Sequence, residues 1–195
     1  MIVVVRHGRT AANAGGLLLG RLDPALDDEG ERQAGALAAA CRPLDVARIV
    51  SSPLGRCRQT AQAIEETVGA PVEVDERWIE LDYGELDGRP LAELPANLWA
   101  DWRSDTTWAP AGGEALVALG TRVRDACEAL VDTAQDRDVI VVSHVSPIKA
   151  AVTWALGVGD EVAWRMWVAP ASITRIGVAG GRPSLRAFNE LAHLG

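Results

Sequence analysis

Runs of β-branched residues alternate with helical patterns along most of the chain. Residues 2–5 and 139–142 are unbroken runs of Ile and Val, without the polar alternation of a strand that faces solvent on one side. Such runs are typical of strands buried on both faces of a parallel sheet. The other predicted strands cover residues 47–51, 71–75, 161–168, 172–178 and 183–188.

Helices are expected between these strands. Asp27 can cap a helix over residues 27–41, because its carboxylate can accept from the unpaired N–H groups of the first turn. Ser52 is expected to cap a second helix, with Pro53 at its first position, that runs to about residue 69. The other predicted helices cover residues 114–133, where the apolar spacing is amphipathic, and 146–156.

This alternation favours an α/β fold with a mainly parallel central sheet and helices on both of its faces. A chain of 195 residues is the size of a single domain. Residues 76–111 interrupt the pattern with several glycines and prolines and four tryptophans, and they are expected to form an excursion with one or two short helices. The tryptophans from Trp99 to Trp108 form either a satellite core or a substrate lid, and both hypotheses stay open.

Composition and charge disfavour several kinds of partner. The formal net charge of −8 argues against nucleic acids and anionic membranes. No apolar run approaches the roughly 20 residues of a membrane-spanning helix, and the first six residues do not resemble a secretory signal. Three cysteines without C-x-x-C spacing are typical of unpaired thiols in a cytoplasmic protein. The edge strands or the tryptophan-rich region could support a homodimer.

Basic and imidazole side chains follow the ends of three predicted strands. Arg6 and His7 follow the first strand, Arg56 follows the second, and His144 follows the strand at 139–142. Because the carboxyl ends of parallel strands share one edge of a sheet, these side chains are expected to meet there. Two guanidinium groups beside two imidazoles, in an acidic chain, indicate an anion site, and guanidinium groups match phosphate oxygens in pairs.

Several sequence blocks carry a family resemblance. Residues 6–13, RHGRTAAN, are similar to the R-H-G-x-T-x-x-N signature of the histidine phosphatase superfamily, in its phosphoglycerate-mutase-like branch. Further blocks resemble that family in the same order: GRLDPAL at 20–26, SSPLGRCRQTA at 51–61, ELDYGELDG at 80–88, PAGGE at 110–114 and VSH at 142–144. A lone R-H-G would be a weak signal, whereas this many blocks in order cover most of the chain.

The resemblance implies a metal-independent phosphohydrolase with the three-layer fold of phosphoglycerate mutases. His7 would attack phosphorus and carry the phosphoryl group, and Glu80 would protonate the leaving group and then activate water. The residues expected around the transferred group are Arg6, Arg56 and His144. The expected substrate-binding residues are Thr10, Asn13, Gly20 and Val145. The implied substrate is a small phosphorylated metabolite, the product is inorganic phosphate, and no cofactor is expected.

Three alternatives remain at this point. A cofactor-dependent phosphoglycerate mutase would use the same phosphohistidine. Mutases, however, have the pattern E-R-H-Y-G around the acid, and here Leu81 and Asp82 replace its Arg and His, which removes positive charge from the site. A metallohydrolase is disfavoured because no H-E-x-x-H or comparable ligand set is present, and the arginines would repel a cation. A phosphate-binding module without turnover is a further, remote alternative. The sequence also places Val145 where the family often has glycine.

Overall fold

The computed structural model describes residues 1–195 and contains one six-stranded sheet in the order β3-β2-β4-β1-β5-β6. The first four strands in this order are parallel, whereas β5 pairs antiparallel with β1 and β6 pairs antiparallel with β5. The strands are β1 (Ile2–Arg6), β2 (Val46–Ser51), β3 (Val72–Val74), β4 (Asp138–Ser143), β5 (Ile173–Ala179) and β6 (Arg182–Glu190). The mainly parallel sheet expected from the sequence is therefore confirmed.

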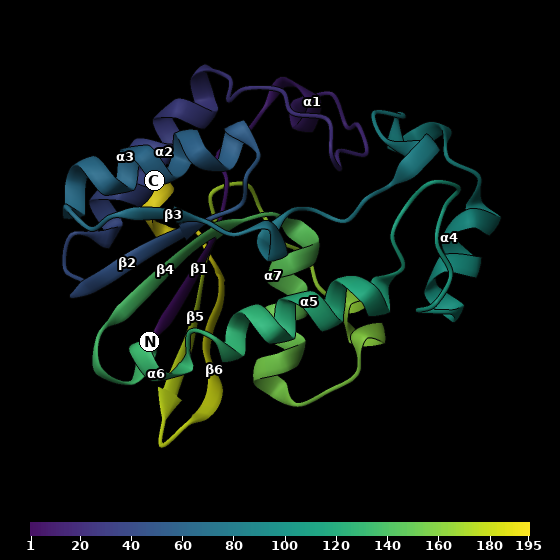
Figure 1. Ribbon diagram of the computed structural model, residues 1–195. Helices are drawn as coiled ribbons and strands as arrows, with labels where there is room; N and C mark the ends of the chain where they lie inside the picture. Colours follow the sequence, from purple (N-terminus) through teal and green to yellow (C-terminus); the bar gives the residue numbers. More distant parts are fainter.

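Helices cover both faces of this sheet (Figure 1). One face carries α2 (Asp28–Cys41) and α3 (Gly55–Val68), and the other carries α5 (Leu116–Glu128), α6 (Val131–Asp136) and α7 (Val145–Leu156). Two short helices lie outside these layers: α1 (Ala11–Ala14), after the first strand, and α4 (Ala96–Ser104), in the excursion. The three layers agree with the fold class that the sequence predicts.

The unbroken apolar run of β1 is explained by burial on both faces. Val3 and Val5 belong to the core cluster beneath α2 and α3, whereas Ile2 and Val4 belong to the larger cluster beneath α5 and α7. All four side chains are fully buried. Burying a side chain of this size contributes about 1.5–3 kcal/mol, so the strand that positions His7 is firmly fixed in the sheet.

Three local predictions are wrong. Ser52 does not cap a helix at Pro53, because its hydroxyl bonds the ring of His144, which follows β4; residues 53 and 54 form a bend, and Leu54 is the actual N-cap. The helix expected over 114–133 ends at Glu128, and a tight turn separates it from α6. Residues 160–165 form a 3-10 helix rather than a strand, since Asp160 pairs with Arg124 of α5 at 2.7 Å.

The excursion at 76–111 contains the single α-helix α4 and three 3-10 helices (Glu76–Trp78, Gly84–Leu86 and Leu91–Glu93). Trp102 is fully buried in the larger core cluster. Its ring contacts Tyr83, Trp99, Trp108 and Trp164, with centroid distances of 5.4–5.8 Å. Trp102 thus belongs to the main core rather than to a separate satellite core, and whether the segment moves as a lid stays a prediction.

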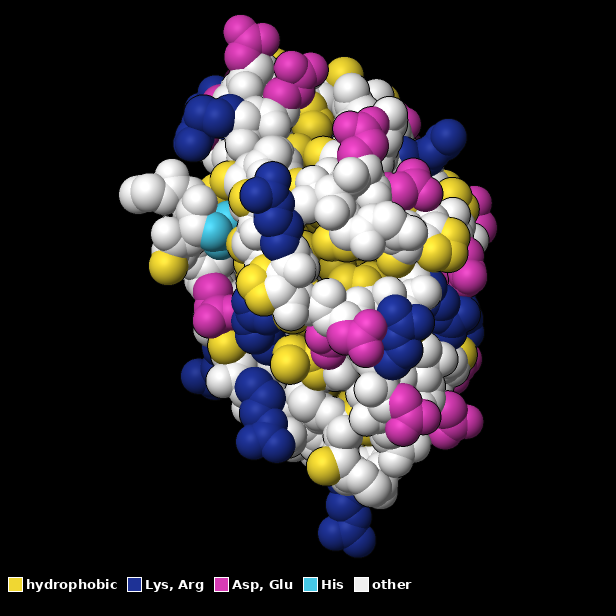
Figure 2. Space-filling model, turned by 90° about the vertical axis from the view of Figure 1, so that its left-hand side faces the viewer, with side chains coloured by type: hydrophobic (Ala, Val, Ile, Leu, Met, Phe, Trp, Pro, Cys, Tyr) yellow, Lys and Arg dark blue, Asp and Glu magenta, His cyan; other side chains and the backbone are white.

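The surface is consistent with the charge analysis. On the face shown in Figure 2, acidic and basic side chains are interspersed and form no continuous basic patch. No helix of the structure combines the length and the apolar character that crossing a bilayer requires.

Candidate active site

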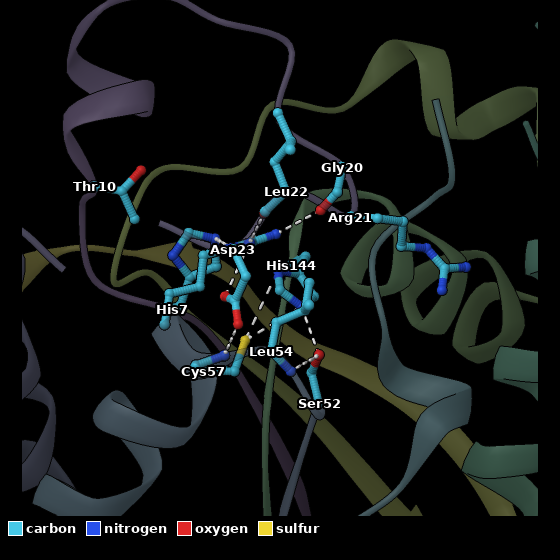
Figure 3. Close-up of polar contacts among 12 residues, drawn as sticks. His7, Thr10, Gly20, Arg21, Leu22, Asp23, Ser52, Leu54, Cys57 and His144 are labelled. Carbon is cyan, nitrogen blue, oxygen red and sulfur yellow. Dashed lines mark hydrogen bonds and ion pairs between the residues drawn. The ribbon is translucent and has the colours of Figure 1, made fainter. Parts of the chain in front are cut away.

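The ends of β1 and β4 bring two histidines together, as the sequence predicts. The strands are paired in parallel from Ile2 to Arg6, and the His7 amide donates to the Ser143 carbonyl at 3.0 Å. The His7 and His144 rings therefore lie edge to face, with centroids 5.1 Å apart. Both imidazoles are buried, and Figure 3 shows them side by side at the centre of a polar network.

The tautomer of His7 is fixed by its own backbone. Nδ1 lies 2.7 Å from the Gly8 carbonyl, which can only accept, so Nδ1 carries the proton. Nε2 is then unprotonated and carries a lone pair, which accepts a hydrogen bond from the Arg56 Nε–H at 3.3 Å. Burial, followed by the charges of Arg6 and Arg56, holds the pKa of His7 well below its usual 6.5. The imidazole is thus neutral and nucleophilic at Nε2 near neutral pH.

Arg56 is fully buried and is held by the loop that follows α1. Its two terminal nitrogens donate to the carbonyls of Leu22 and Gly20, at 2.7 and 2.8 Å. Asp23 lies 3.6 Å from the guanidinium and is itself 41% exposed. Because its Nε–H also donates to Nε2 of His7, the Arg56 guanidinium links this loop directly to the nucleophile.

Asp87 fixes that loop from the excursion, a role that the sequence reasoning missed. Its carboxylate accepts from the backbone N–H groups of Gly20, Arg21 and Leu22 at 2.7–2.8 Å. Gly20 is also closely packed, since a Cβ there would lie 2.8 Å from the Leu81 carbonyl. Asp87 stands just before the last glycine of the block at 80–88, and this place in the motif is the signal that could have identified it.

His144 is held by residues of the block at 51–61. Its Nε2 lies 2.7 Å from the Ser52 hydroxyl and 3.4 Å from the Cys57 sulfur. Burial raises the pKa of the Cys57 thiol, so it stays protonated and donates to the Ser143 carbonyl. Burial also lowers the pKa of His144, and electrostatic coupling to His7 and to the guanidinium groups of Arg56 and Arg6 lowers it further. His144 is consequently a neutral, well-ordered ring beside the nucleophile.

Glu80 is the only carboxylate among the residues that line the cleft next to His7. It is buried, and its Oε1 accepts from the N–H groups of Leu81 at 2.7 Å and Ser146 at 3.2 Å. Ser146 lies in the first turn of α7, where backbone N–H groups are unpaired and favour an anion. Tyr83 supports this turn through a 3.3 Å bond to the Ser146 hydroxyl.

A cleft of about 470 Å³ opens over these groups. Most of the residues that line it are apolar, and a smaller set of polar side chains interrupts this apolar lining. The polar members are Arg6, His7, Asn13, Glu80, Tyr83, Ser146 and Lys149, and the apolar wall includes Leu17, Leu19, Leu91, Trp99, Trp102, Leu116, Val145, Trp164 and Trp167. The cleft can therefore accept a phosphate beside Arg6 and His7 and a larger, partly apolar group against the rest of its lining.

The expected substrate-binding residues occupy different places. Asn13 and Val145 line the cleft. Thr10 does not: it is fully buried and caps α1 by accepting from the Asn13 amide at 3.2 Å, and Figure 3 shows it apart from the histidine network. Gly20 contributes its carbonyl to Arg56 rather than a surface of the cleft.

The donor set at this site suits an anion. No group of three His, Cys, Asp or Glu side chains is placed to hold a metal ion. One terminal nitrogen of Arg6 donates a hydrogen bond to the Val168 carbonyl at 2.8 Å, while the buried Nε of Arg6 has no hydrogen-bond partner. A buried guanidinium donor without a partner is costly, and a phosphate oxygen is the acceptor that its geometry fits.

Comparison with known proteins agrees with this geometry. The family model "Histidine phosphatase superfamily (branch 1)" matches residues 2–191. A bifunctional protein of Mycobacterium tuberculosis is 33% identical over 99% of this chain, which spans about half (54%) of that protein's length. A glucosyl-3-phosphoglycerate phosphatase of Mycolicibacterium vanbaalenii is 36% identical over 80% of this chain and 74% of its own length.

Solved structures give the same result. A mycobacterial glucosyl-3-phosphoglycerate phosphatase in complex with VO3 superposes with a TM-score of 0.89 and 32% identity, over 97% of this chain and 98% of that one. A phosphoserine phosphatase of Entamoeba histolytica in complex with 3-phosphoglyceric acid has a TM-score of 0.89 and 25% identity, over 99% and 98% of the two chains. The matched residues span the sheet, the excursion and every motif of the site, and this chain belongs to the histidine phosphatase superfamily.

Proposed function

We propose that this protein hydrolyses small phosphomonoesters through a phosphohistidine on His7, without a metal ion. The observation that carries the proposal is the fixed tautomer of His7, whose Nδ1–H donates to Gly8 while Nε2 keeps its lone pair. Two further findings support it: the matched family and the phosphatase relatives, of which one acts on glucosyl-3-phosphoglycerate and one on phosphoserine by name.

The reaction then proceeds in two displacements. Nε2 of His7 forms a bond to phosphorus, the ester P–O bond breaks, and Glu80 gives its proton to the departing oxygen. Water then attacks the phosphohistidine and gives a proton to Glu80, which frees His7 and inorganic phosphate. Arg6, Arg56 and His144 stabilise the charge of the transferred group in both steps.

The roles of the remaining site residues form part of the same proposal. Asn13 binds the phosphoryl group from the end of the cleft that it lines, and the Val145 side chain contacts the leaving group. Thr10 and Gly20 act by shaping the two loops that hold Asn13 and Arg56. The three unpaired cysteines support a cytoplasmic location, and the homodimer stays a prediction.

Phosphate release from a panel of phosphomonoesters, with EDTA present, tests the proposal. The panel includes 3-phosphoglycerate, with and without 2,3-bisphosphoglycerate, and phosphoserine. We expect release by the wild type that EDTA does not reduce and that His7→Ala abolishes. Transfer of phosphate between positions of phosphoglycerate, with little release, would instead identify a mutase, and loss of activity in EDTA would identify a metalloenzyme.

A further inference from the structure

Lys149 is the only lysine of the chain, because the other eighteen of its nineteen basic residues are arginines. Arginine supplies the side chain in every ion pair of the structure that involves a basic residue. The remaining amine, at Met1, is paired with Asp138 at 3.0 Å on the N-terminal side of the sheet. The single ammonium side chain is therefore found at one place only, and that place is the cleft.

Lys149 lies on the cleft-facing side of α7. It follows Val145 by four residues, so both lie on the same face of the helix, and both line the cleft with His7 and Glu80. Unlike Arg56 and His144, which are fully buried, Lys149 is only partly buried. Its side chain is thus positioned to meet a group that enters the cleft beyond the phosphoryl site.

No protein group neutralises this ammonium. Lys149 takes part in none of the ion pairs or side-chain hydrogen bonds of the structure. The charges that act on it are those of Glu80 and Arg6. Both Glu80 oxygens already accept from backbone N–H groups, and Arg6 repels it. Burial lowers the pKa of Lys149, and Glu80 opposes that effect. A desolvated cation of this kind gains most from an anionic ligand.

The phosphoryl group is not the only candidate for that anion. Arg6, Arg56, His7 and His144 already converge at the strand ends, and planar guanidinium groups suit the several oxygens of phosphate. A flexible, compact ammonium one helical turn along α7 suits a single carboxylate better. We propose that Lys149 binds a carboxylate on the leaving group, so that the preferred substrates are phosphate esters of hydroxy acids. This inference rests on the proposed phosphatase function and specifies its substrate class.

A matched pair of esters tests the inference. 3-Phosphoglycerate and glycerol 3-phosphate differ in one carboxylate, which a CH2OH group replaces in the second. We expect Lys149→Met to lower kcat/KM for 3-phosphoglycerate about 30-fold, the loss of one charge-assisted hydrogen bond. The value for glycerol 3-phosphate should change less than about threefold. The wild type should prefer 3-phosphoglycerate, and Lys149→Arg should restore part of that preference.

Arg182→Met is the matched control. It removes one positive charge from an exposed position at the β5–β6 turn, at the opposite edge of the sheet from the histidines. It should leave both kcat/KM values unchanged. Thermal unfolding of each variant separates loss of fold from loss of recognition.

Three results would overturn the inference. An equal loss on both esters would place Lys149 at the phosphate or at Glu80. No loss on either ester would mean that Lys149 is a solvated cation without a role in recognition. Equal kcat/KM values of the wild type for the two esters would show that the protein has no preference for a carboxylate, and this result does not depend on whether the variants fold. Failure of the proposed function is distinct, because the wild type would then release phosphate from neither ester, or His7→Ala would retain the activity.

Discussion

Replacement of Asp87 by alanine offers a sharp test of how the site is held together. Asp87 accepts three backbone hydrogen bonds from residues 20–22 and contacts no catalytic group directly. That segment in turn supplies the two carbonyls that hold Arg56, and Arg56 donates to Nε2 of His7. The Asp87→Ala variant should therefore release Arg56 without altering the nucleophile.

The magnitude follows from the hydrogen bonds lost. A bond to a charged acceptor contributes about 1.5–3 kcal/mol when buried, and less here because Asp87 is half-buried and water can replace part of it. We estimate a loss of about 2 kcal/mol in the free energy of unfolding. If between half and all of this free energy is lost from the stabilisation of the transition state by Arg56, kcat falls about 5- to 30-fold, while KM changes little.

Steady-state phosphate release and urea denaturation measure the two effects separately. Asp105→Ala is the control, because Asp105 also accepts from a local backbone N–H, that of Thr107, but lies outside the site. It should lose stability without a comparable loss of kcat. A normal kcat in Asp87→Ala, despite the loss of stability, would refute the chain of contacts from Asp87 through residues 20–22 to Arg56.

Other predictions follow from single contacts. Ser52→Ala should lower kcat about tenfold in phosphate-release assays, because the His144 ring loses its 2.7 Å partner; an unchanged kcat would remove that role. Gly30→Ala should destabilise the fold strongly in thermal unfolding, since its Cβ would collide with the Arg9 carbonyl, whereas Gly35→Ala, with open space, should be neutral or stabilising. The lowered pKa values of His7 and His144 mean that the unfolded chain binds more protons below pH 6.5. The free energy of unfolding should therefore rise with pH up to about 6.5 and then level off; a flat urea-midpoint profile, or one unchanged in His144→Asn, would contradict this.

The sequence predicted those parts of the fold that local patterns determine. The runs at 2–5 and 139–142 became β1 and β4, because a strand buried on both faces must be apolar throughout. Their shared edge then placed Arg6, His7 and His144 together, as the topology of a parallel sheet requires.

Two of the three wrong predictions share a physical cause. Ser52 has the local preference of an N-cap, but a contact with His144, 92 residues away, takes its hydroxyl. Likewise Asp160 forms an ion pair with Arg124 of α5, and the residues that follow it form a 3-10 helix instead of a strand. Such tertiary contacts override local propensity and leave no trace in the spacing of apolar residues.

The site itself divides in the same way. Residue types at strand ends indicated the anion site, and the family resemblance implied the roles of His7 and Glu80. The positions of Asp87 and Lys149 were missed, since a half-buried aspartate in an irregular segment and a lysine inside an apolar helix show no periodic signal. Only the fold brings Asp87 to residues 20–22 and turns Lys149 toward the cleft.

The central claim is that the phosphoryl group passes through His7. The most direct test is to mix the protein with excess phosphomonoester, quench the reaction in alkali during turnover, and determine the mass of each peptide. We predict one phosphoryl group on the peptide that contains His7, stable in alkali and lost in acid, and none in His7→Ala. Steady phosphate release without any phosphorylated His7, together with inversion of configuration at phosphorus, would show direct attack by water and contradict the mechanism.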